Sequence, residues 1–337
     1  MTPPDFPDIA NLGAPVYVAF ILAELVMIRL RRAKGEYETR DTATSLAMGL
    51  GSVVADALGA AVSVGILMAA WELRLFDWGF SIAAIVACFV LDDFRFYWTH
   101  RLAHRSRWFW ADHVIHHSSQ HYNLSTALRQ PWTGLFTGLF LFRAPLALLG
   151  FHPAIVAFCA GLNLFYQFFV HTETVKRLHP WIEAVFNTPS HHRVHHARNP
   201  AYLDSNYAGV LIVWDRLFGT FVPEDDRDPC RYGLVKGIAT FNPLRVAFHE
   251  WIGIARDQAR PGLSLKDRLG YLFAPPGWSH DGSRLGSEAV KAEWLARHPD
   301  QADRPGLRRV ARASGKPISD SAATSVEPPQ VAGGASS

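Results

Sequence analysis

Long apolar stretches constrain the fold of this 337-residue chain more than any other feature. A helix needs about 20 mostly apolar residues to cross a bilayer, and such stretches lie at 13–30, within 44–71, and at 79–98, 132–149 and 153–170. Hydrophobic residues make up 49% of the chain and charged residues 19%, which is apolar for a soluble protein. We therefore predict an all-α integral membrane helical bundle of about four to five spans.

Charges on either side of the first stretch indicate its orientation. The segment MTPPDFPDIANL before it carries acid and no base, which argues against a cleavable signal peptide. The basic residues that follow place 29–40 in the cytosol; they are Arg29, Arg31, Arg32 and Lys34. Counting spans from this point puts every histidine group on the same side. We predict a multi-pass membrane protein with its active site on the cytosolic face, held by a cytosolic helical cap.

Thirteen of the sixteen histidines lie between His100 and His196, and none precedes them. They form groups in FYWTHRLAH, ADHVIHHSS, FFVHTE and NTPSHHRVHHARN. Spacings of three and four place side chains on one face of a helix. Two matching arcs are expected, one from ADHVIHH and one from HHRVHH, and they could face each other across a metal site.

The number of histidines indicates more than one metal ion. A structural zinc site needs four ligands and usually recruits cysteine, whereas nine well-spaced imidazoles exceed one closed tetrahedral site. Imidazole suits Fe, Zn, Cu or Ni. His152 and His179 stand beside proline and are expected to be structural turn residues, while His121 and His191 remain ambiguous.

Two further features bear on the site. Asp93 lies on one helical stripe with Tyr97, His100 and His104, so it could orient a ligating histidine; a structural pair with Arg95 or Arg129 is the alternative. In NTPSHH, Thr188 can cap a helix and Pro189 suits its first turn. The last histidine group would then sit on a rigid element.

Several motifs are missing from the sequence. The three cysteines are far apart, which excludes a disulfide framework and an iron–sulfur site. There is no G-x-G-x-x-G, no P-loop and no Glu-x-x-His. Redox chemistry would therefore need electrons from an external donor, either a protein or a reduced cofactor. The net charge of +3 gives no reason to expect a nucleic-acid partner.

Composition divides the chain into four parts. We expect N-terminal membrane helices at 1–78, a histidine-rich catalytic domain at 79–225, a cytosolic C-terminal helical region at 226–302 and a disordered tail at 303–337. The tail is rich in Pro, Ser, Ala and Gly, and such a composition buries too little apolar surface to order itself.

Three of the histidine motifs resemble those of a known enzyme family. HRLAH, HVIHH and HHRVHH resemble the histidine boxes of the fatty acid hydroxylase and sterol desaturase superfamily of integral-membrane di-iron enzymes. The text around them, such as HHSSQHYNLSTALRQ and NYAGVLIVWDRLFGTF, resembles the alkylglycerol monooxygenase branch, which hydroxylates the carbon next to an ether oxygen. The likeness covers about residues 80–225, and GYLFAPPGW at 270–278 is similar as well.

The resemblance implies a membrane-bound oxygenase that hydroxylates a lipid C–H bond with O2. It implies two iron ions and nine ligands: His100, His104, His113, His116, His117, His171, His192, His195 and His196. His191 and Glu173 would be near neighbours. That branch has Glu directly after the second histidine of the first box, where this chain has Arg105, so the resemblance leaves the ether-lipid substrate and the electron donor open.

Alternatives remain at this stage. A lipid or sterol desaturase, or a C-4 methyl oxidase, would use the same irons. A membrane metal transporter or metal-binding protein also collects histidines, although transport favours ligands spread through the depth of several spans. The aromatic residues Trp98, Trp108, Phe109, Trp110 and Trp132 could line an apolar substrate groove or form a membrane-interface belt.

Overall fold

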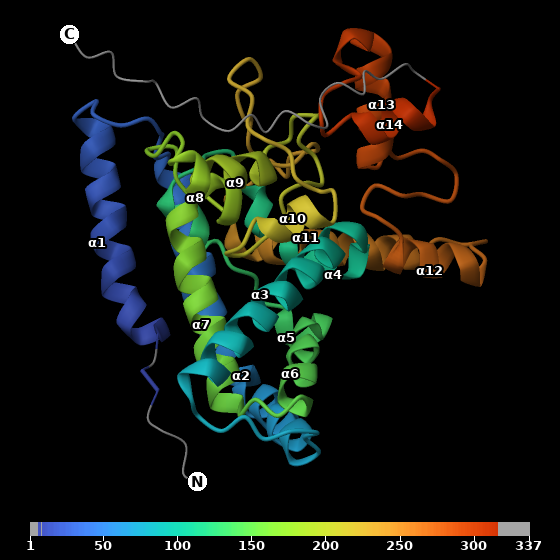
Figure 1. Cartoon of the computed structure of the whole chain (residues 1–337). Helices are drawn as coiled ribbons and strands as arrows, with labels where there is room; N and C mark the ends of the chain where they lie inside the picture. Colours follow the sequence, from blue (N-terminus) through green and yellow to red (C-terminus); the bar gives the residue numbers. More distant parts are fainter. Residues whose placement is uncertain (1–5, 8, 316–337) are drawn as a thin grey trace, which may run out of the picture.

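The computed structural model describes residues 6, 7 and 9–315. It is all-helical: within these residues there is no strand, only two isolated bridges that pair Phe186 with Leu211 and Ala197 with Tyr232. The long helices are α1 (Ile9–Arg29), α2 (Thr39–Glu72), α3 (Ile82–Arg105) and α7 (Pro153–Val170). They stand side by side as an upright bundle, and most of the shorter helices gather at one end of it (Figure 1).

Within the described residues, three helices are long and apolar enough to cross a membrane: Leu12–Arg29, Thr39–Glu72 and Pro153–Val170. The other two predicted spans do not reach this standard. Residues 79–98 enter α3, whose middle carries Asp92, Asp93 and Arg95. A charged group within the bilayer is costly, so these residues distinguish α3 from the three apolar helices.

The stretch 132–149 is not one helix, which corrects the prediction of a continuous span there. It is divided into α5 (Gly134–Thr137), the 3-10 helix η3 (Leu139–Arg143) and α6 (Ala144–Leu148). Gly138 ends α5 in a left-handed conformation with φ of 78°, which glycine adopts without steric cost. The stretch is apolar, as its composition indicates, but the backbone turns at Gly138.

α2 is longer than a helix needs to be to cross a bilayer. α2 has 34 residues, so it is about 51 Å long and exceeds the roughly 30 Å hydrocarbon core of a bilayer. Its first turns therefore extend beyond the hydrocarbon core of the bilayer.

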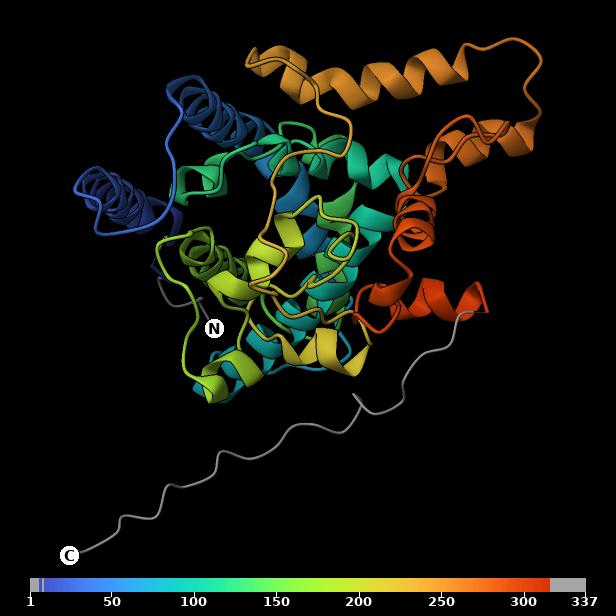
Figure 2. The ribbon, with the colours of Figure 1, turned by 90° about the horizontal axis from the view of Figure 1, so that it is seen from above.

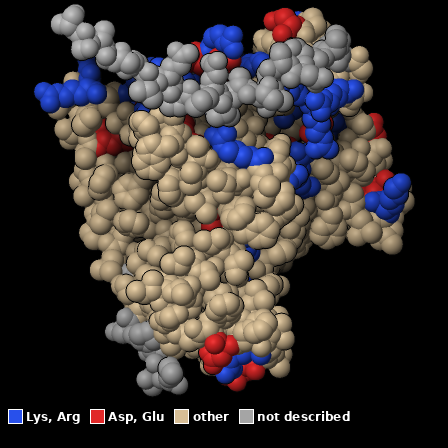
Figure 3. Space-filling view, viewed as in Figure 1, with Lys and Arg blue, Asp and Glu red and all other residues tan. Residues whose placement is uncertain are grey.

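The two ends of the bundle differ in charge. A space-filling view shows a broad uncharged surface over the upright helices and a rim of Lys and Arg at the end that carries α8 and α9 (Figure 3).

The cap at this end consists of short helices and loops. It contains α4 (Arg107–His113), η1 (His116–Ser118), η2 (Leu124–Leu128), α8 (Pro180–Val185), α9 (Pro189–His196) and α10 (Val213–Leu217). α11 (Pro243–Gln258) and α12 (Leu265–Phe273) lie across the direction of the upright helices at the edge of the molecule (Figures 1 and 2).

The last helices pack on the cap. They are α13 (Ser287–Arg297), η4 (Pro299–Gln301) and α14 (Arg308–Ala313). Leu307 and Ala311 are fully buried in a cluster with Val194 and Tyr202. Residues 303–315, which we predicted to be disordered, are therefore folded, because Leu307 and Ala311 supply apolar anchors that the overall composition hides. The rest of the predicted tail lies outside the described residues.

Candidate metal centre

All nine predicted histidines meet at one end of the bundle. They form two groups in which the possible ligand atoms lie within 4.8 Å of one another. The first group is His100, His104, His113, His117 and His195; the second is His116, His171, His192 and His196. The two groups adjoin, since the rings of His117 and His196 stack with centroids 4.4 Å apart.

Five elements supply these side chains. α3 carries His100 and His104 one turn apart, and α4 ends at His113. His116 and His117 lie on η1, and His171 caps the end of α7. The remaining three, His192, His195 and His196, project from α9. A centre built from the ends of α3 and α7 and from α9 has a rigid frame.

The first group has the spacing of ligands around a common point. Nε2 of His113 lies 2.9 Å from Nε2 of His100 and 3.0 Å from Nε2 of His117. Nε2 of His104 and Nε2 of His195 are buried and meet no hydrogen-bond partner in the part of the chain that the structure describes. Buried polar atoms of this kind are rare unless a ligand satisfies them.

The second group repeats this arrangement. Nε2 of His171 lies 3.0 Å from Nε2 of His116 and 3.0 Å from Nε2 of His192. Nε2 of His192 lies 3.2 Å from Nε2 of His196. Ligand atoms about 2.0–2.1 Å from one ion would be separated by distances of this order.

Backbone carbonyls determine which nitrogen faces the centre. Nδ1 of His171 donates to the carbonyl of Gln167 at 2.7 Å, and Nδ1 of His116 donates to the carbonyl of Arg129 at 3.3 Å. A neutral imidazole has one proton, so both Nε2 atoms present lone pairs to each other at 3.0 Å. Neither can donate, and a cation between them would resolve the repulsion. The residues present therefore fit a metal ion.

The first group is held in the same way. Nδ1 of His100 donates to the carbonyl of Tyr207 at 2.8 Å, and Nδ1 of His195 donates to the carbonyl of Ser205 at 2.9 Å. Nδ1 of His104 faces Oδ1 of Asp204 at 3.6 Å. Such acceptors orient a ligating ring and fix its tautomer. The sequence does not predict the backbone acceptors, because every residue has a carbonyl and the fold decides which one faces a histidine.

Burial keeps the imidazoles neutral. Desolvation, with the proximity of His104, lowers the pKa of His100 to about 3, and desolvation lowers the pKa of His171 to about 4. Burial also holds the pKa of His113, His117 and His195 well below the ordinary value. Only the neutral ring can ligate a metal, so these rings are ready to bind at neutral pH.

Local structure differs from the prediction at one histidine group and agrees with it at another. HVIHH does not form one helical face, since α4 ends at His113 and η1 begins at His116. Val114 and Ile115 between them are buried against Met48 and Val246, and this apolar contact turns the chain. The predicted arc on α9 is confirmed, with Pro189 in its first turn.

Thr188 is the N-cap residue of α9, but its side chain does not cap the helix. Its hydroxyl instead donates to Oε1 of Glu183 at 2.9 Å. The same carboxylate, through Oε2, accepts from Ser190 at 2.7 Å and faces Nε2 of His191 at 3.1 Å. Glu183 thus braces the start of α9, and neither Thr188 nor His191 reaches the centre.

Asp93 makes neither of the contacts proposed for it. Its carboxylate accepts from the backbone N–H of Val210 at 2.8 Å, that of Leu211 at 3.0 Å and Nε1 of Trp214 at 2.9 Å. Arg95 pairs with Asp92 and Arg129 pairs with Asp41. Asp93 therefore holds the loop that follows Tyr207 in place. The carbonyl of Tyr207 in turn orients the ring of His100.

The other predicted neighbours lie outside the two histidine groups. Glu173 accepts from the hydroxyl of Tyr232 at 3.1 Å, and Tyr232 stacks on Tyr122, whose ring lies 5.2 Å from that of His196. His152 caps α7 through Nδ1, as expected of a turn residue. His121 faces Glu36 at 3.3 Å, and His179 precedes α8.

Arg105 pairs with carboxylates of the cap and of α13. Its Nη1 lies 3.6 Å from Oδ2 of Asp204 and 3.5 Å from Oε1 of Glu288 on α13. Because Oδ1 of the same Asp204 faces His104, Arg105 balances a carboxylate that orients a ring. Arg105, the residue at which this chain differs from the alkylglycerol branch, therefore lies between the cap and α13.

Comparison with known proteins agrees with the histidine pattern. Residues 85–220 match the family model described as Fatty acid hydroxylase. Alkylglycerol monooxygenase of Homo sapiens is 39% identical over 84% of this chain and 62% of its own length. The protein of the same name from Danio rerio is 40% identical over 85% of this chain and 63% of its own length.

A more distant relative covers a smaller part of the chain. Ornithine lipid hydroxylase OlsE of Rhizobium tropici is 31% identical over 41% of each chain. No solved structure matches. The chain spans a little over three fifths of the length of the alkylglycerol monooxygenases that it matches. The histidines of both groups lie within residues 85–220, the segment that matches the Fatty acid hydroxylase family model.

Proposed function

We propose that this protein is a membrane-bound non-haem di-iron oxygenase that hydroxylates a lipid C–H bond. The net reaction would consume the C–H bond, O2, two electrons and two protons, and yield an alcohol and water. The electrons would come from an external donor. The observation that carries the proposal is the pair of adjoining all-histidine groups, in which the Nε2 atoms of His116 and His171 face each other without a proton to share.

The nine histidines would hold two iron ions, which supply the activation of O2 when bound. An octahedral ion has six positions, so five and four imidazoles leave positions open in both groups. Open positions distinguish a catalytic metal site from a closed structural one. A transporter would instead spread its ligands through the depth of the spans, whereas here they form two adjoining groups, and α9, which carries three of them, lies at one end of the bundle (Figure 1).

The chain itself would contribute orientation and exclusion of water. The carbonyls of Tyr207, Ser205, Gln167 and Arg129 hold four of the rings in one tautomer. Eight of the nine histidines are buried and His113 is half-buried, which limits the access of water to reactive species. Trp110 packs against the rings of His104 and His117, with centroids 5.1 and 5.6 Å away, and closes that side with an apolar surface.

We propose an alkylglycerol as the first substrate to test. Two relatives that bear this substrate in their names are about 40% identical to this chain, and Arg105 pairs with the carboxylates of Asp204 and Glu288. Hydroxylation next to an ether oxygen would give a hemiacetal, which breaks down to an aldehyde and glycerol. A desaturase with the same ions would instead remove two hydrogens from a chain.

We also propose that the centre faces the cytosol. Arg29, Arg31, Arg32 and Lys34 follow α1 directly, and excess Lys and Arg mark the cytosolic side of membrane proteins. Lys and Arg gather on the same end of the molecule as the cap (Figure 3).

The test is lipid analysis of membranes from cells that make this chain and receive a 1-O-alkylglycerol, iron and 18O2. We expect loss of the ether lipid and an aldehyde that carries the label. The matched ester lipid should be unchanged. His116→Ala should abolish the product, whereas His121→Ala, outside both groups, should retain it. An unchanged lipid profile with iron bound and a reductant supplied would contradict the proposal, and a product that lacks two hydrogens would favour desaturation.

A further inference from the structure

Two consecutive helices outside the metal centre expose apolar stripes. On α11, Leu244, Phe248 and Ile252 are 62%, 38% and 44% exposed. On α12, Leu265, Leu269 and Phe273 have the same spacing of four and are also exposed. Residues four apart share one face of a helix. Each helix therefore presents a continuous apolar row to its surroundings.

The remaining faces of α11 show what those surroundings are. Val246 and Ala247 are buried with Met48 of α2. Arg245 and Arg256 are exposed and lie roughly 100–120° around the helix from Leu244. An apolar face with a basic flank is typical of a helix that lies in the plane of a membrane, with its cations among the headgroups.

The position of α11 agrees with this interpretation. It lies across the upright bundle together with α12 (Figures 1 and 2). It packs on α2, one of the candidate spans, near Met48. Just beyond that contact, Leu50 and Val54 of α2 are exposed apolar residues. The stripe on α11 thus continues the apolar surface of a membrane helix.

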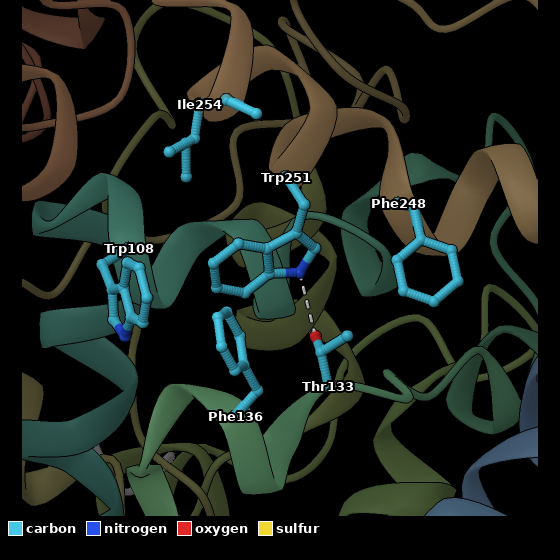
Figure 4. Close-up of a pocket in the computed structure, with 7 residues that line it drawn as sticks. Trp108, Thr133, Phe136, Phe248, Trp251 and Ile254 are labelled. Atoms are coloured by element: carbon cyan, nitrogen blue, oxygen red, sulfur yellow. Dashed lines mark hydrogen bonds between the residues drawn. The ribbon is translucent and has the colours of Figure 1, made fainter. Parts of the chain in front are cut away.

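An apolar pocket of about 510 Å³ adjoins the stripe between α4, α5 and α11. Its walls include Trp108, Phe136, Phe248 and Trp251 (Figure 4). Phe248 belongs both to this wall and to the exposed row. Thr133 also lines the pocket, but its hydroxyl donates to Oδ1 of Asp112 at 2.6 Å and accepts from Nε1 of Trp251 at 3.1 Å. Its hydrogen-bonding capacity is therefore used within the protein.

We infer that α11 and α12 lie in the bilayer interface and that this pocket binds one alkyl chain of a membrane lipid. The volume is within the usual range for a ligand pocket. Its walls offer aromatic and aliphatic surface, and its polar groups are satisfied, so an apolar chain fits better than a headgroup. The basic flank beside the stripe suits the phosphates of the surrounding lipids.

The pocket is tied to the helix that carries His113. Arg107 at the start of α4 donates to Oε1 of Glu250 at 2.6 Å and to Oδ2 of Asp257 at 2.7 Å, both on α11. Asp112, which accepts from Thr133, directly precedes His113. A lipid chain in the pocket would lie against the helix that carries a histidine of the first group. The inference requires a membrane but no metal, so it stands apart from the proposed chemistry.

Photocrosslinking of the full chain in phosphatidylcholine nanodiscs tests the inference. Benzoylphenylalanine would replace Leu265, Phe248 or, as a control, the exposed Arg297 on α13. We expect lipid adducts by mass spectrometry at 265 and 248 and none at 297. Absence of an adduct at 265 would overturn the in-plane placement. An adduct at 265 without one at 248 would overturn the pocket.

A pocket-filling variant separates occupancy from mere proximity to lipid. Ala255 lines the pocket and is exposed, so Ala255→Trp would fill it from the open side. We expect this change to remove the adduct at 248 and to retain that at 265; an unchanged adduct at 248 would contradict chain binding in the pocket. If substitution at Phe248 lowers the melting temperature, quenching of Trp251 by chain-brominated lipid, measured against Trp251→Phe, decides the same question.

Discussion

Nη2 of Arg129 lies 2.7 Å from Oδ1 of Asp41, and both side chains are almost fully buried. Arg129 also donates to Ser45 of α2 at 3.1 Å and to Ser118 of η1 at 3.0 Å. Its own carbonyl accepts from Nδ1 of His116. The ion pair therefore joins α2 to the histidines of the second group.

Arg129→Met should lower stability by about 3–5 kcal/mol, because it leaves Asp41 buried without its cation. We expect a lower melting temperature and weaker metal binding in the second group. Asp41→Asn in the same background should recover part of the stability, since no unpaired charge then remains. Thermal unfolding and metal analysis of the four proteins of this cycle measure both effects. Full metal content in Arg129→Met would show that the carbonyl keeps its place without the side chain.

Metal content gives the second prediction. Two ions per chain are expected by elemental analysis, and each group should lose its ion separately: His195→Ala that of the first, His171→Ala that of the second. Removal of the metal by a chelator should lower the unfolding free energy by about 4 kcal/mol for each ion lost, if free metal exceeds the dissociation constant of that site about 1,000-fold. One ion in the native chain, or its full retention in both variants, would refute the two-group assignment.

The helical class follows from apolar length, which is a local property, and the nine histidines that the resemblance implies as ligands fall in the two groups. The sequence did not predict the break at Gly138, since a composition that suits a span does not reveal a left-handed turn. The role of Asp93 also depends on tertiary structure, because its partners Val210 and Leu211 are more than a hundred residues away. The same holds for Arg105, whose carboxylate partners come from a loop and from α13.

Asp93→Ala should weaken metal binding in the first group, although the partners of Asp93 are Val210, Leu211 and Trp214 and not the histidines. The change leaves the buried N–H of Val210 and the partly buried N–H groups of Leu211 and Trp214 without their acceptor, and the cost is about 1–3 kcal/mol for a fully buried group. The loop that carries Tyr207 would loosen, so we expect a lower melting temperature and a loss of metal from the first group. Asp92→Ala is the matched control, since Asp92 pairs with Arg95 instead. Equal metal loss in both variants would assign the effect to α3 as a whole.

Arg105→Glu tests whether this position serves the metal centre or only the cap. A third carboxylate beside Asp204 and Glu288 would replace attraction by repulsion, so we expect a stability loss on the order of 1–2 kcal/mol. Metal content should remain two ions per chain, because Asp204 still faces Nδ1 of His104 in this variant. Arg105→Gln, which removes the charge alone, should give an intermediate melting temperature, and Glu288→Arg should partly rescue Arg105→Glu. Loss of an ion from Arg105→Glu at an unchanged melting temperature would place Arg105 in the metal centre after all.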